Sequence, residues 1–186
     1  MINVNELKNG VVIEYDGKLM QILEFMHVLQ NKVAYVRVKM KDLRTGSIME
    51  TALKGSDSAF KKCFIDRKPM QYIFSSGESY TFMDNETYEQ IEIPAQRLEW
   101  EKNFLLEGMN VDVTFYETEI LGVNLPDKVT LEVTETEPAI KGNTKTNANK
   151  DATLETGYTL KVPMFIEKGE KIIVSTATGE YSSRSK

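Results

Sequence analysis

Hydrophobic and polar residues alternate with a period of two along most of the chain, as they do in half-buried β-strands. The clearest case is residues 33–40, where Val36, Val38 and Met40 share one face and Arg37 and Lys39 share the other. The pattern therefore predicts an all-β protein. The other predicted strands are residues 11–15, 19–25, 48–53, 71–74, 80–83, 109–116, 120–123, 128–133, 160–166 and 171–176.

Turn signals separate these strands. Asp16-Gly17 is a strong signal for a two-residue hairpin turn, and residues 44–47, 75–78 and 84–87 are further turns. Pro163 inside a strand run indicates a sheet edge or a bulge. The best candidate for a helix is residues 95–106, where Leu98, Phe104 and Leu105 would form its apolar face and Trp100 would anchor it on a barrel.

Grouping the strands predicts three small β-barrel domains with boundaries after residues 64 and 127. Residues 1–64 form an SH3-like N-terminal domain, and residues 65–127 and 128–186 form a central and a C-terminal OB-type domain. The two OB-type domains share a plan, but no sequence repeat can be demonstrated. Residues 142–150 form a polar loop, which is either a connector or a binding loop.

The formal net charge of −5 is unevenly distributed along the chain. Residues 1–64 carry ten basic and seven acidic residues, a net of +3. Residues 65–127 carry four and thirteen, a net of −9, and residues 128–186 carry nine and eight, a net of +1. The asymmetry suggests that the two end domains contact a polyanion, although a solvated surface explains such a pattern equally well.

Catalytic motifs are absent, which favours a binding protein over an enzyme. There is no glycine-rich phosphate loop, and one histidine with one cysteine makes a zinc site improbable, so neither a metal nor a cofactor is expected. Cys63 and His27 could form a catalytic pair in a small hydrolase, but both lie in or beside apolar strands, and ordinary packing is the simpler interpretation.

The same composition indicates a cytoplasmic location. No apolar run approaches the roughly 18 residues that a membrane span needs, so no membrane contact is expected. The N-terminus lacks the basic start and apolar core of a signal peptide, and a single cysteine excludes an internal disulfide.

Four stretches carry a resemblance to a known family. Residues 150–169 match the pattern K-x-A-x4-G-x2-[LIV]-x-V-P-x2-[LIV]-x2-G at every fixed position, and residues 179–184 resemble the ending G-E-Y-x-S-R. Residues 82–90 and 39–46 look like hallmarks of a second and a first domain of the same family. Over essentially its whole length, the chain resembles bacterial elongation factor P.

The resemblance implies a non-catalytic translation factor. Members of this family consist of three β domains, the first SH3/KOW-like and two OB-type, in an L-shaped arrangement. They act as monomers, contact both ribosomal subunits and the peptidyl-site tRNA between the exit and peptidyl sites, and promote peptide bonds at stalled, proline-rich sequences. The charge distribution agrees, because the units expected near tRNA are the two with positive balance.

The resemblance also points to a tip residue facing the peptidyl-transferase centre. The family's first-domain hairpin carries K-P-G-K-G-G, whereas this chain has residues 27–35 without the flanking Pro and Gly and one residue shorter when counted from Tyr35. Lys32 falls on the tip position and is a candidate for a lysine-modifying enzyme, with Asn31-Lys32 as a two-residue turn. The alternative is a tight structural hairpin whose lysine is solvated.

The remaining expected RNA contacts lie in the two end domains. Tyr181 and Arg184 match the terminal motif, with a frayed tail as the alternative, and the stretch at 142–144 resembles the family's G-D-T, with a simple connector as the alternative. The full set of expected RNA-binding residues is Asn31, Arg37, Lys39, Gly142, Asn143, Thr144, Tyr181 and Arg184.

Two other functions remain open. The chain could be a divergent paralogue of the family with an altered target preference, given its shortened hairpin. It could also be a generic OB-type protein that binds single-stranded nucleic acid, but such a protein needs aromatic residues on an exposed basic face. Most aromatic residues here fall in the acidic middle domain, which disfavours that alternative.

Overall fold

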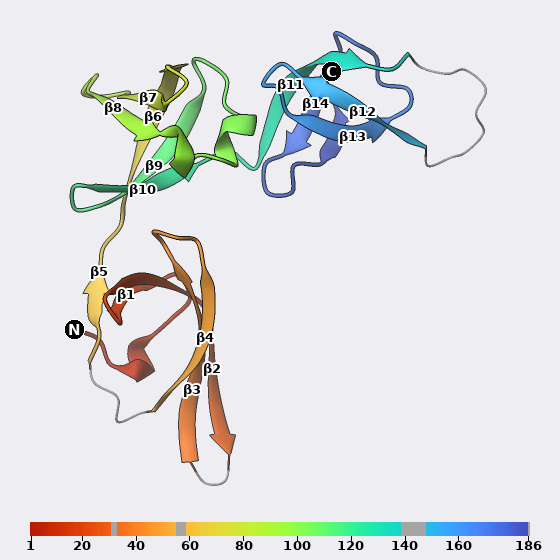
Figure 1. Cartoon of the computed structure of the whole chain (residues 1–186). Helices are drawn as coiled ribbons and strands as arrows, with labels where there is room; N and C mark the ends of the chain where they lie inside the picture. The colour runs from red at the N-terminus through yellow and green to blue at the C-terminus, as the bar shows by residue number, and fades with distance from the viewer. Residues whose placement is uncertain (31–32, 55–58, 139–147, 186) are drawn as a thin grey trace. The chain divides into compact units, whose positions relative to one another are not determined.

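The computed structural model describes residues 1–30, 33–54, 59–138 and 148–185. Within these residues it contains β-strands and three single-turn 3-10 helices but no α-helix, which confirms the all-β prediction (Figure 1). The 3-10 helices are η1 (Val4–Glu6), η2 (Ala95–Arg97) and η3 (Glu101–Asn103). The strands are β1 (Val12–Tyr15), β2 (Lys18–Gln30), β3 (Val33–Asp42), β4 (Ile48–Lys54), β5 (Lys61–Cys63), β6 (Asp66–Ser75), β7 (Ser79–Asp84), β8 (Gln90–Pro94), β9 (Asn110–Tyr116), β10 (Glu119–Asn124), β11 (Lys128–Thr136), β12 (Asn149–Leu154), β13 (Thr159–Pro163), β14 (Lys171–Ser175) and β15 (Tyr181–Arg184).

The first sheet has the order β4-β3-β2-β1-β5, and all its neighbouring strands are antiparallel. Val36, Val38 and Met40 are buried in its core, as their alternation predicted. The turn between β1 and β2 is Asp16-Gly17, and both residues have positive φ, 50° and 71°. Positive φ at both central residues is the type I′ geometry whose twist matches that of a hairpin.

The second and third sheets share one topology. Their orders are β10-β9-β6-β7-β8 and β13-β12-β11-β14-β15. When the strands of each sheet are numbered from one to five in chain order, both sheets have the neighbour order 5-4-1-2-3, the third sheet being read from β15 to β13. The first strand of each sheet is therefore at its centre. The similar plan expected from the sequence is therefore present, although the sequence shows no repeat.

By its internal contacts, the chain divides into two compact units. One comprises Met1–Arg67 with Thr114–Gly122, and the other Lys68–Val113 with Val123–Lys186. In the first unit Leu121 of β10 packs with Val12, Leu19 and Cys63. The domain boundaries expected after residues 64 and 127 stay predictions.

Within the second unit Trp100 joins the segment after β8 to the third sheet. Its indole Nε1 donates a 2.8 Å hydrogen bond to the carbonyl oxygen of Thr176. Its ring packs edge-on against Phe104 and Tyr158, with centroid distances of 5.2 and 6.2 Å. Trp100 is therefore an anchor, as expected, but it anchors the segment on the third sheet rather than on the second.

The helix expected over residues 95–106 is wrong in form, because two separate 3-10 turns, η2 and η3, occupy this stretch. Leu98, Phe104 and Leu105 are buried as expected. Between them, however, positions 101 and 102 hold Glu and Lys, so no continuous apolar stripe exists. A segment this short gains too little from helix propagation to form an α-helix without such a stripe.

Other strand predictions need correction at their ends. The strand expected over residues 160–166 ends at Pro163, and Ile166 then turns inward, with its N–H bonded to the carbonyl of Pro163. The strand β13 lies at the edge of its sheet, as expected for a strand with a proline. Pattern reasoning missed β5, β8, β12 and β15, which are short or mostly polar.

Three six-residue hairpin loops have the same backbone hydrogen bonds. They are the 42–47 loop between β3 and β4, the 84–89 loop between β7 and β8, and the 175–180 loop between β14 and β15. In each loop the first N–H donates to the sixth carbonyl, the fifth N–H to the first carbonyl, and the sixth N–H to a threonine hydroxyl at the fourth position. The fifth residue always has positive φ: Gly46 at 76°, Tyr88 at 59° and Gly179 at 74°.

Candidate nucleic-acid interface

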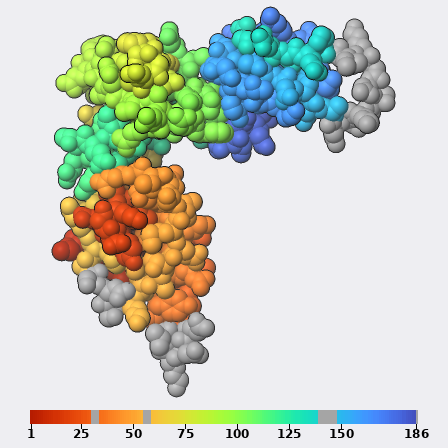
Figure 2. Space-filling view, viewed as in Figure 1, coloured from red at the N-terminus to blue at the C-terminus, as the bar shows by residue number. Residues whose placement is uncertain are grey.

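Strand β2, the longest strand in the described part of the chain, forms a hairpin with β3. Their register extends from Met20 opposite Asp42 to Gln30 opposite Val33. The neighbouring strand β4 pairs with β3 only as far as Tyr35. Among the described residues, the hairpin therefore continues past the paired part of β4 as far as Gln30 and Val33 (Figure 1; Figure 2 shows the same view in space-filling form).

Asn31 and Lys32, which connect the two strands, lie outside the described residues, so their expected roles stay predictions. What the structure adds is the pairing of the residues on either side of them, Gln30 with Val33. Only two residues therefore separate the paired ends, which agrees with the short connection expected from the sequence.

Arg37 and Lys39 point away from the core of the first sheet, on the opposite face of β3 from Val36 and Val38. Each cation has a carboxylate on a neighbouring strand. Arg37 lies 3.4 Å from Glu50 of β4, and Lys39 lies 3.5 Å from Glu24 of β2. Exposed pairs of this kind contribute about 0–1 kcal/mol, so a phosphate can replace the carboxylate at little cost.

Tyr181 and Arg184 both lie in β15, the edge strand of the third sheet. Tyr181 packs on the core of that sheet, opposite Val174. The Arg184 guanidinium forms an ion pair with Glu170 and lies 5.5 Å from the centre of the Phe165 ring. The alternative of a frayed tail is wrong for residues 181–184, while RNA binding by this pair stays a prediction.

The expected contacts at Gly142, Asn143 and Thr144 also lie outside the described residues. The strands that flank this stretch are β11 and β12, and side chains hold them together where they end. The Thr134 and Thr136 hydroxyls donate to the carbonyls of Thr153 and Asp151, at 3.0 and 2.8 Å. These bonds supplement a ladder whose register shifts between Val133 and Glu135.

Lys150, the first residue of the matched pattern, is buried next to these bonds. Only 4% of its surface is exposed, and its ammonium donates to the carbonyl oxygen of Glu137. A buried ammonium needs such a partner, because losing water without a replacement is costly. Sequence reasoning used Lys150 only to recognise the pattern and missed its structural role, since no local signal marks a lysine as buried.

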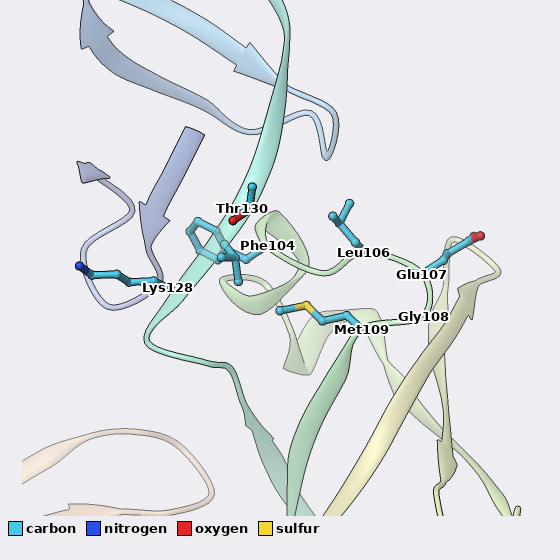
Figure 3. A pocket seen from close by; sticks show the side chains of 8 residues that line it. Phe104, Leu106, Glu107, Gly108, Met109, Lys128 and Thr130 are labelled. Carbon is cyan, nitrogen blue, oxygen red and sulfur yellow. The ribbon is translucent and has the colours of Figure 1, made fainter. Parts of the chain in front are cut away.

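A groove of about 410 Å³ lies in the second unit where the chain passes from η3 to β9 and into β11 (Figure 3). Phe104, Leu106 and Met109 provide its apolar surface. The charged side chains of Glu107 and Lys128 lie at its opposite ends and extend away from each other. No acid–base pair converges here, so the groove offers no catalytic arrangement.

Cys63 and His27 each have other neighbours. Cys63 is buried, and its hydrogen bond with the Tyr116 hydroxyl is the main cause that raises the pKa of Tyr116. The exposed His27 stacks edge-on against Phe25, with 4.8 Å between ring centroids. These contacts agree with the packing interpretation and give the hydrolase alternative no support.

The described part of the chain offers neither a metal cluster nor a membrane-spanning helix. Among residues 1–30, 33–54, 59–138 and 148–185, no three His, Cys, Asp or Glu side chains are grouped so that they could hold a metal ion. In the same ranges, no helix has the length and apolar character needed to cross a membrane.

Three family sequence models match the chain in succession. Residues 3–59 match the elongation factor P KOW-like domain, residues 65–123 the elongation factor P OB domain, and residues 129–184 the elongation factor P C-terminal domain. Together they cover nearly the whole chain.

Similar solved structures include a eukaryotic translation initiation factor 5A from Methanococcus jannaschii and a family protein of translation initiation factor 5A from Naegleria fowleri. The first is 26% identical with a TM-score of 0.49, and the match covers 66% of this chain and 94% of that one. The second is 19% identical with a TM-score of 0.48, and the match covers 67% and 96%.

Proposed function

Because this chain belongs to the elongation factor P family of translation factors, we propose that it binds the ribosome between the exit and peptidyl sites. There it contacts both subunits and the peptidyl-site tRNA and promotes peptide bonds at stalled, proline-rich sequences. It works in the cytoplasm as a monomer with three domains, bounded near residues 64 and 127, and the ribosome remains the catalyst.

The observation that carries this proposal is the ordered succession of three family domains along the chain, with the β2–β3 hairpin in the first of them. A two-stranded extension suits a narrow ribosomal site. Farther from the hairpin end, where β3 also pairs with β4, the outward face of β3 carries Arg37 and Lys39, whose carboxylate partners a tRNA phosphate can displace.

The chemical need for such a factor follows from proline itself. Proline is a secondary amine whose ring holds φ near −65°, so it is a poor nucleophile in a strained chain. A factor that holds the peptidyl tRNA in a productive geometry lowers the entropic part of the barrier, and such positioning can contribute several kcal/mol. In this mechanism Lys32 at the hairpin tip stabilises the tRNA end, with its ammonium as a compact donor.

The third domain supplies the second set of contacts. In the proposal, Arg184 exchanges Glu170 for a phosphate while Tyr181 stays packed and holds β15 in place. Asn143, between Gly142 and Thr144, approaches the codon at the exit site. Lys150 and the threonines of β11 hold the strands that flank this stretch.

The experiment is the synthesis of a triproline peptide by purified ribosomes. The wild-type chain should stimulate it, and Lys32→Ala should abolish the stimulation while ribosome affinity and the unfolding midpoint stay near their wild-type values. Lys41→Ala, on the same strand pair but far from the tip in register, is the matched control. Equal stimulation by the wild type and Lys32→Ala would show that Lys32 is not the tip residue.

The divergent-paralogue alternative is tested by changing the template. If the chain binds ribosomes but stimulates only sequences other than triproline, its target preference differs from the family's. The pairing of Gln30 with Val33 makes this comparison worthwhile, because a connection one residue shorter loses up to roughly 3.5 Å of reach. An intact mass of the natively expressed chain then shows whether a modification of Lys32 restores that reach.

A further inference from the structure

Strand β2 has one long edge that no other strand covers in the described part of the chain. At the start of β2, β1 pairs with residues 18–21, and just before β1 the backbones of Gly10 and Val11 form hydrogen bonds with Ile22. From residue 24 to residue 30, β2 pairs with β3 on one side. Its other side, called here the β2 edge (residues 24–30), has no strand beside it among the described residues.

The backbone of the β2 edge presents its hydrogen-bonding groups at every second residue. Gln30 and Val33 are paired across a connection of only two residues, so they exchange their backbone hydrogen bonds with each other. Bonded and unbonded pairs alternate along an antiparallel ladder. The N–H and C=O groups of Phe25, His27 and Leu29 therefore point away from β3, toward the open edge.

The side chains of the β2 edge lack the features that normally prevent strands from pairing edge to edge. Exposed edges usually carry charged side chains or proline. The edge strands β5 and β8 follow this rule, with Lys61 in the first and Pro94 in the second. Residues 25–29 read Phe-Met-His-Val-Leu, without Asp, Glu, Lys, Arg or Pro, and Met26 and Leu29 are 61% and 75% exposed. An apolar edge with open backbone groups is suited to pair with another strand.

We propose that residues 25–29 pair antiparallel with the same residues of a second copy of this chain. One register brings the outward backbone groups opposite each other over the whole stretch. It places His27 opposite the partner's His27 on a two-fold axis, and Phe25 opposite the partner's Leu29, each pair exchanging its backbone hydrogen bonds. The pairing ends before Ile22, where the backbone bonds of Gly10 and Val11 occupy the edge.

The side chains match in this register on both faces of the strand. Phe25 lies on the core side of β2, and the His27 ring contacts it edge-on at 4.8 Å between centroids. On the opposite face, Met26 lies across from the partner's Val28. Each face therefore brings apolar groups together across the axis, which is the contact that stabilises paired strands.

The composition of the edge favours a second copy over RNA. Residues 25–29 provide no Lys or Arg to attract a phosphate. An unrelated peptide strand satisfies the backbone groups of any open edge, whereas the side-chain pairs named above arise only when this edge meets itself. The contact is short, with five residues on each side against the roughly 20–30 of a standard interface. We therefore expect a weak dimer, half formed at about 100 µM.

This dimer goes beyond the proposed function. A hairpin whose edge is paired with a second copy is not free to enter a ribosomal site, so the dimer is a resting form in exchange with the working monomer. The association itself is measured without ribosomes, on the full chain.

Sedimentation equilibrium over a range of about tenfold on either side of the expected midpoint tests the edge. Leu29→Lys places a charge opposite the partner's Phe25 and should weaken dimerisation at least tenfold. Ile48→Lys is the matched control, because Ile48 is also exposed, at 58%, but begins β4, away from this edge. It should dimerise as the wild type does. A wild-type chain that stays monomeric, species larger than a dimer, or equal losses in both variants would overturn the proposal.

Disulfide trapping tests the register. At the two-fold axis the two copies of residue 27 have their Cα atoms about 5.5 Å apart, within the range of a disulfide, so His27→Cys should form a covalent dimer on mild oxidation. The two copies of residue 29 are about 13 Å apart along the strand, so Leu29→Cys should crosslink far less. The parent chain, whose single cysteine is the buried Cys63, is the blank. Equal yields for the two variants would rule out this register.

The oxidised and reduced forms of His27→Cys then test the resting form in triproline synthesis. The covalent dimer should not stimulate synthesis, and reduction should restore the stimulation. A covalent dimer as active as the reduced chain would show that pairing does not block the hairpin. If the wild-type chain gives no stimulation either, the proposed function fails, and sedimentation and trapping still decide the dimer.

Discussion

The 42–47 loop and the 175–180 loop have the same backbone but different surroundings. A Cβ added at Gly46 would meet nothing within 4 Å, whereas at Gly179 it would lie 2.3 Å from the Tyr158 hydroxyl and 2.8 Å from the Trp100 ring. Both residues have positive φ. The first glycine is therefore required only by local conformation, and the second also by packing in the second unit.

This difference separates two kinds of constraint that a sequence motif cannot distinguish. Both loops place threonine fourth and glycine fifth. The threonine hydroxyl accepts a hydrogen bond from the N–H of the sixth residue, and glycine adopts positive φ without a steric clash. Each loop can therefore form from its own residues. Only the 175–180 loop is also covered by two aromatic rings.

The largest expected effect comes from Gly179→Ala. The new methyl group would crowd Trp100 and Tyr158 and break the bond from the Tyr158 hydroxyl to the carbonyl of residue 179. Together with the unfavourable φ, this should destabilise the chain by about 2–4 kcal/mol. Urea unfolding monitored by Trp100 fluorescence measures it. A loss below that of Gly46→Ala would contradict the packing argument.

Trp100→Phe changes the other partner of the contact between position 179 and the Trp100 ring. The variant keeps an aromatic ring beside Phe104 and Tyr158 but loses the hydrogen bond to the Thr176 carbonyl. We expect a loss of about 1–2 kcal/mol, measured by thermal unfolding in a calorimeter. In the double variant with Gly179→Ala, the combined loss should be less than the sum of the two, because both act on one contact.

Gly46→Ala tests the local constraint alone. With open space around the methyl group, only the left-handed backbone opposes it, so the expected loss is about 1 kcal/mol. The denaturant midpoint measures this. Gly46→Asn should lose less, because asparagine tolerates positive φ, and equal losses would mean that φ is not the cause.

The smallest expected effect is a pH dependence that two of the loops have and the third lacks. Burial acts to raise the pKa of Asp42, but the backbone N–H groups of Arg44 and Thr45 outweigh it and the pKa is lowered below 3.8; the pKa of Asp84 is lowered by the N–H groups of Glu86 and Thr87. A folded-state pKa below the unfolded value gives stability that is present above about pH 4 and is lost as pH falls through the folded pKa.

The measurement is amide hydrogen exchange of the loops between about pH 5 and pH 3, a window that spans the ordinary carboxyl pKa, after correction for the intrinsic rate. The 42–47 and 84–89 loops should lose protection as pH falls. The 175–180 loop begins with Ser175 instead of aspartate and should not change. Equal changes in all three loops would indicate a global effect of acid rather than titration of the two carboxylates.

The sequence alone predicted much of this architecture because its signals are local. Alternation at Val36, Val38 and Met40 predicted a strand with one buried face, and Asp16-Gly17 predicted a tight hairpin turn; both are present. It also predicted the family, because residues 150–169 match a spaced pattern that few unrelated chains would satisfy by chance.

Short and polar strands escaped prediction because partners distant in the sequence stabilise them. The strand β15 reads Tyr-Ser-Ser-Arg and has no clear alternation, yet its pairing with β14 and the packing of Tyr181 hold it in the sheet. The helix expected over residues 95–106 failed for a related reason. Burial of Leu98 and Phe104 is satisfied by two tight turns, and tertiary packing rather than helix propensity decided the form.

The sequence by itself determined what each short segment can do: alternate in a strand, turn at Asp16-Gly17, or match a family pattern. The tertiary structure alone decided which side chains lose their freedom, because burial depends on residues far away in the chain. It placed Lys150 in the interior beside Glu137 and paired Arg184 with Glu170. It also left Tyr88 exposed at a positive φ, where the two counterpart loops have glycine. Burial and pairing are properties of contacts between segments, and no segment contains them alone.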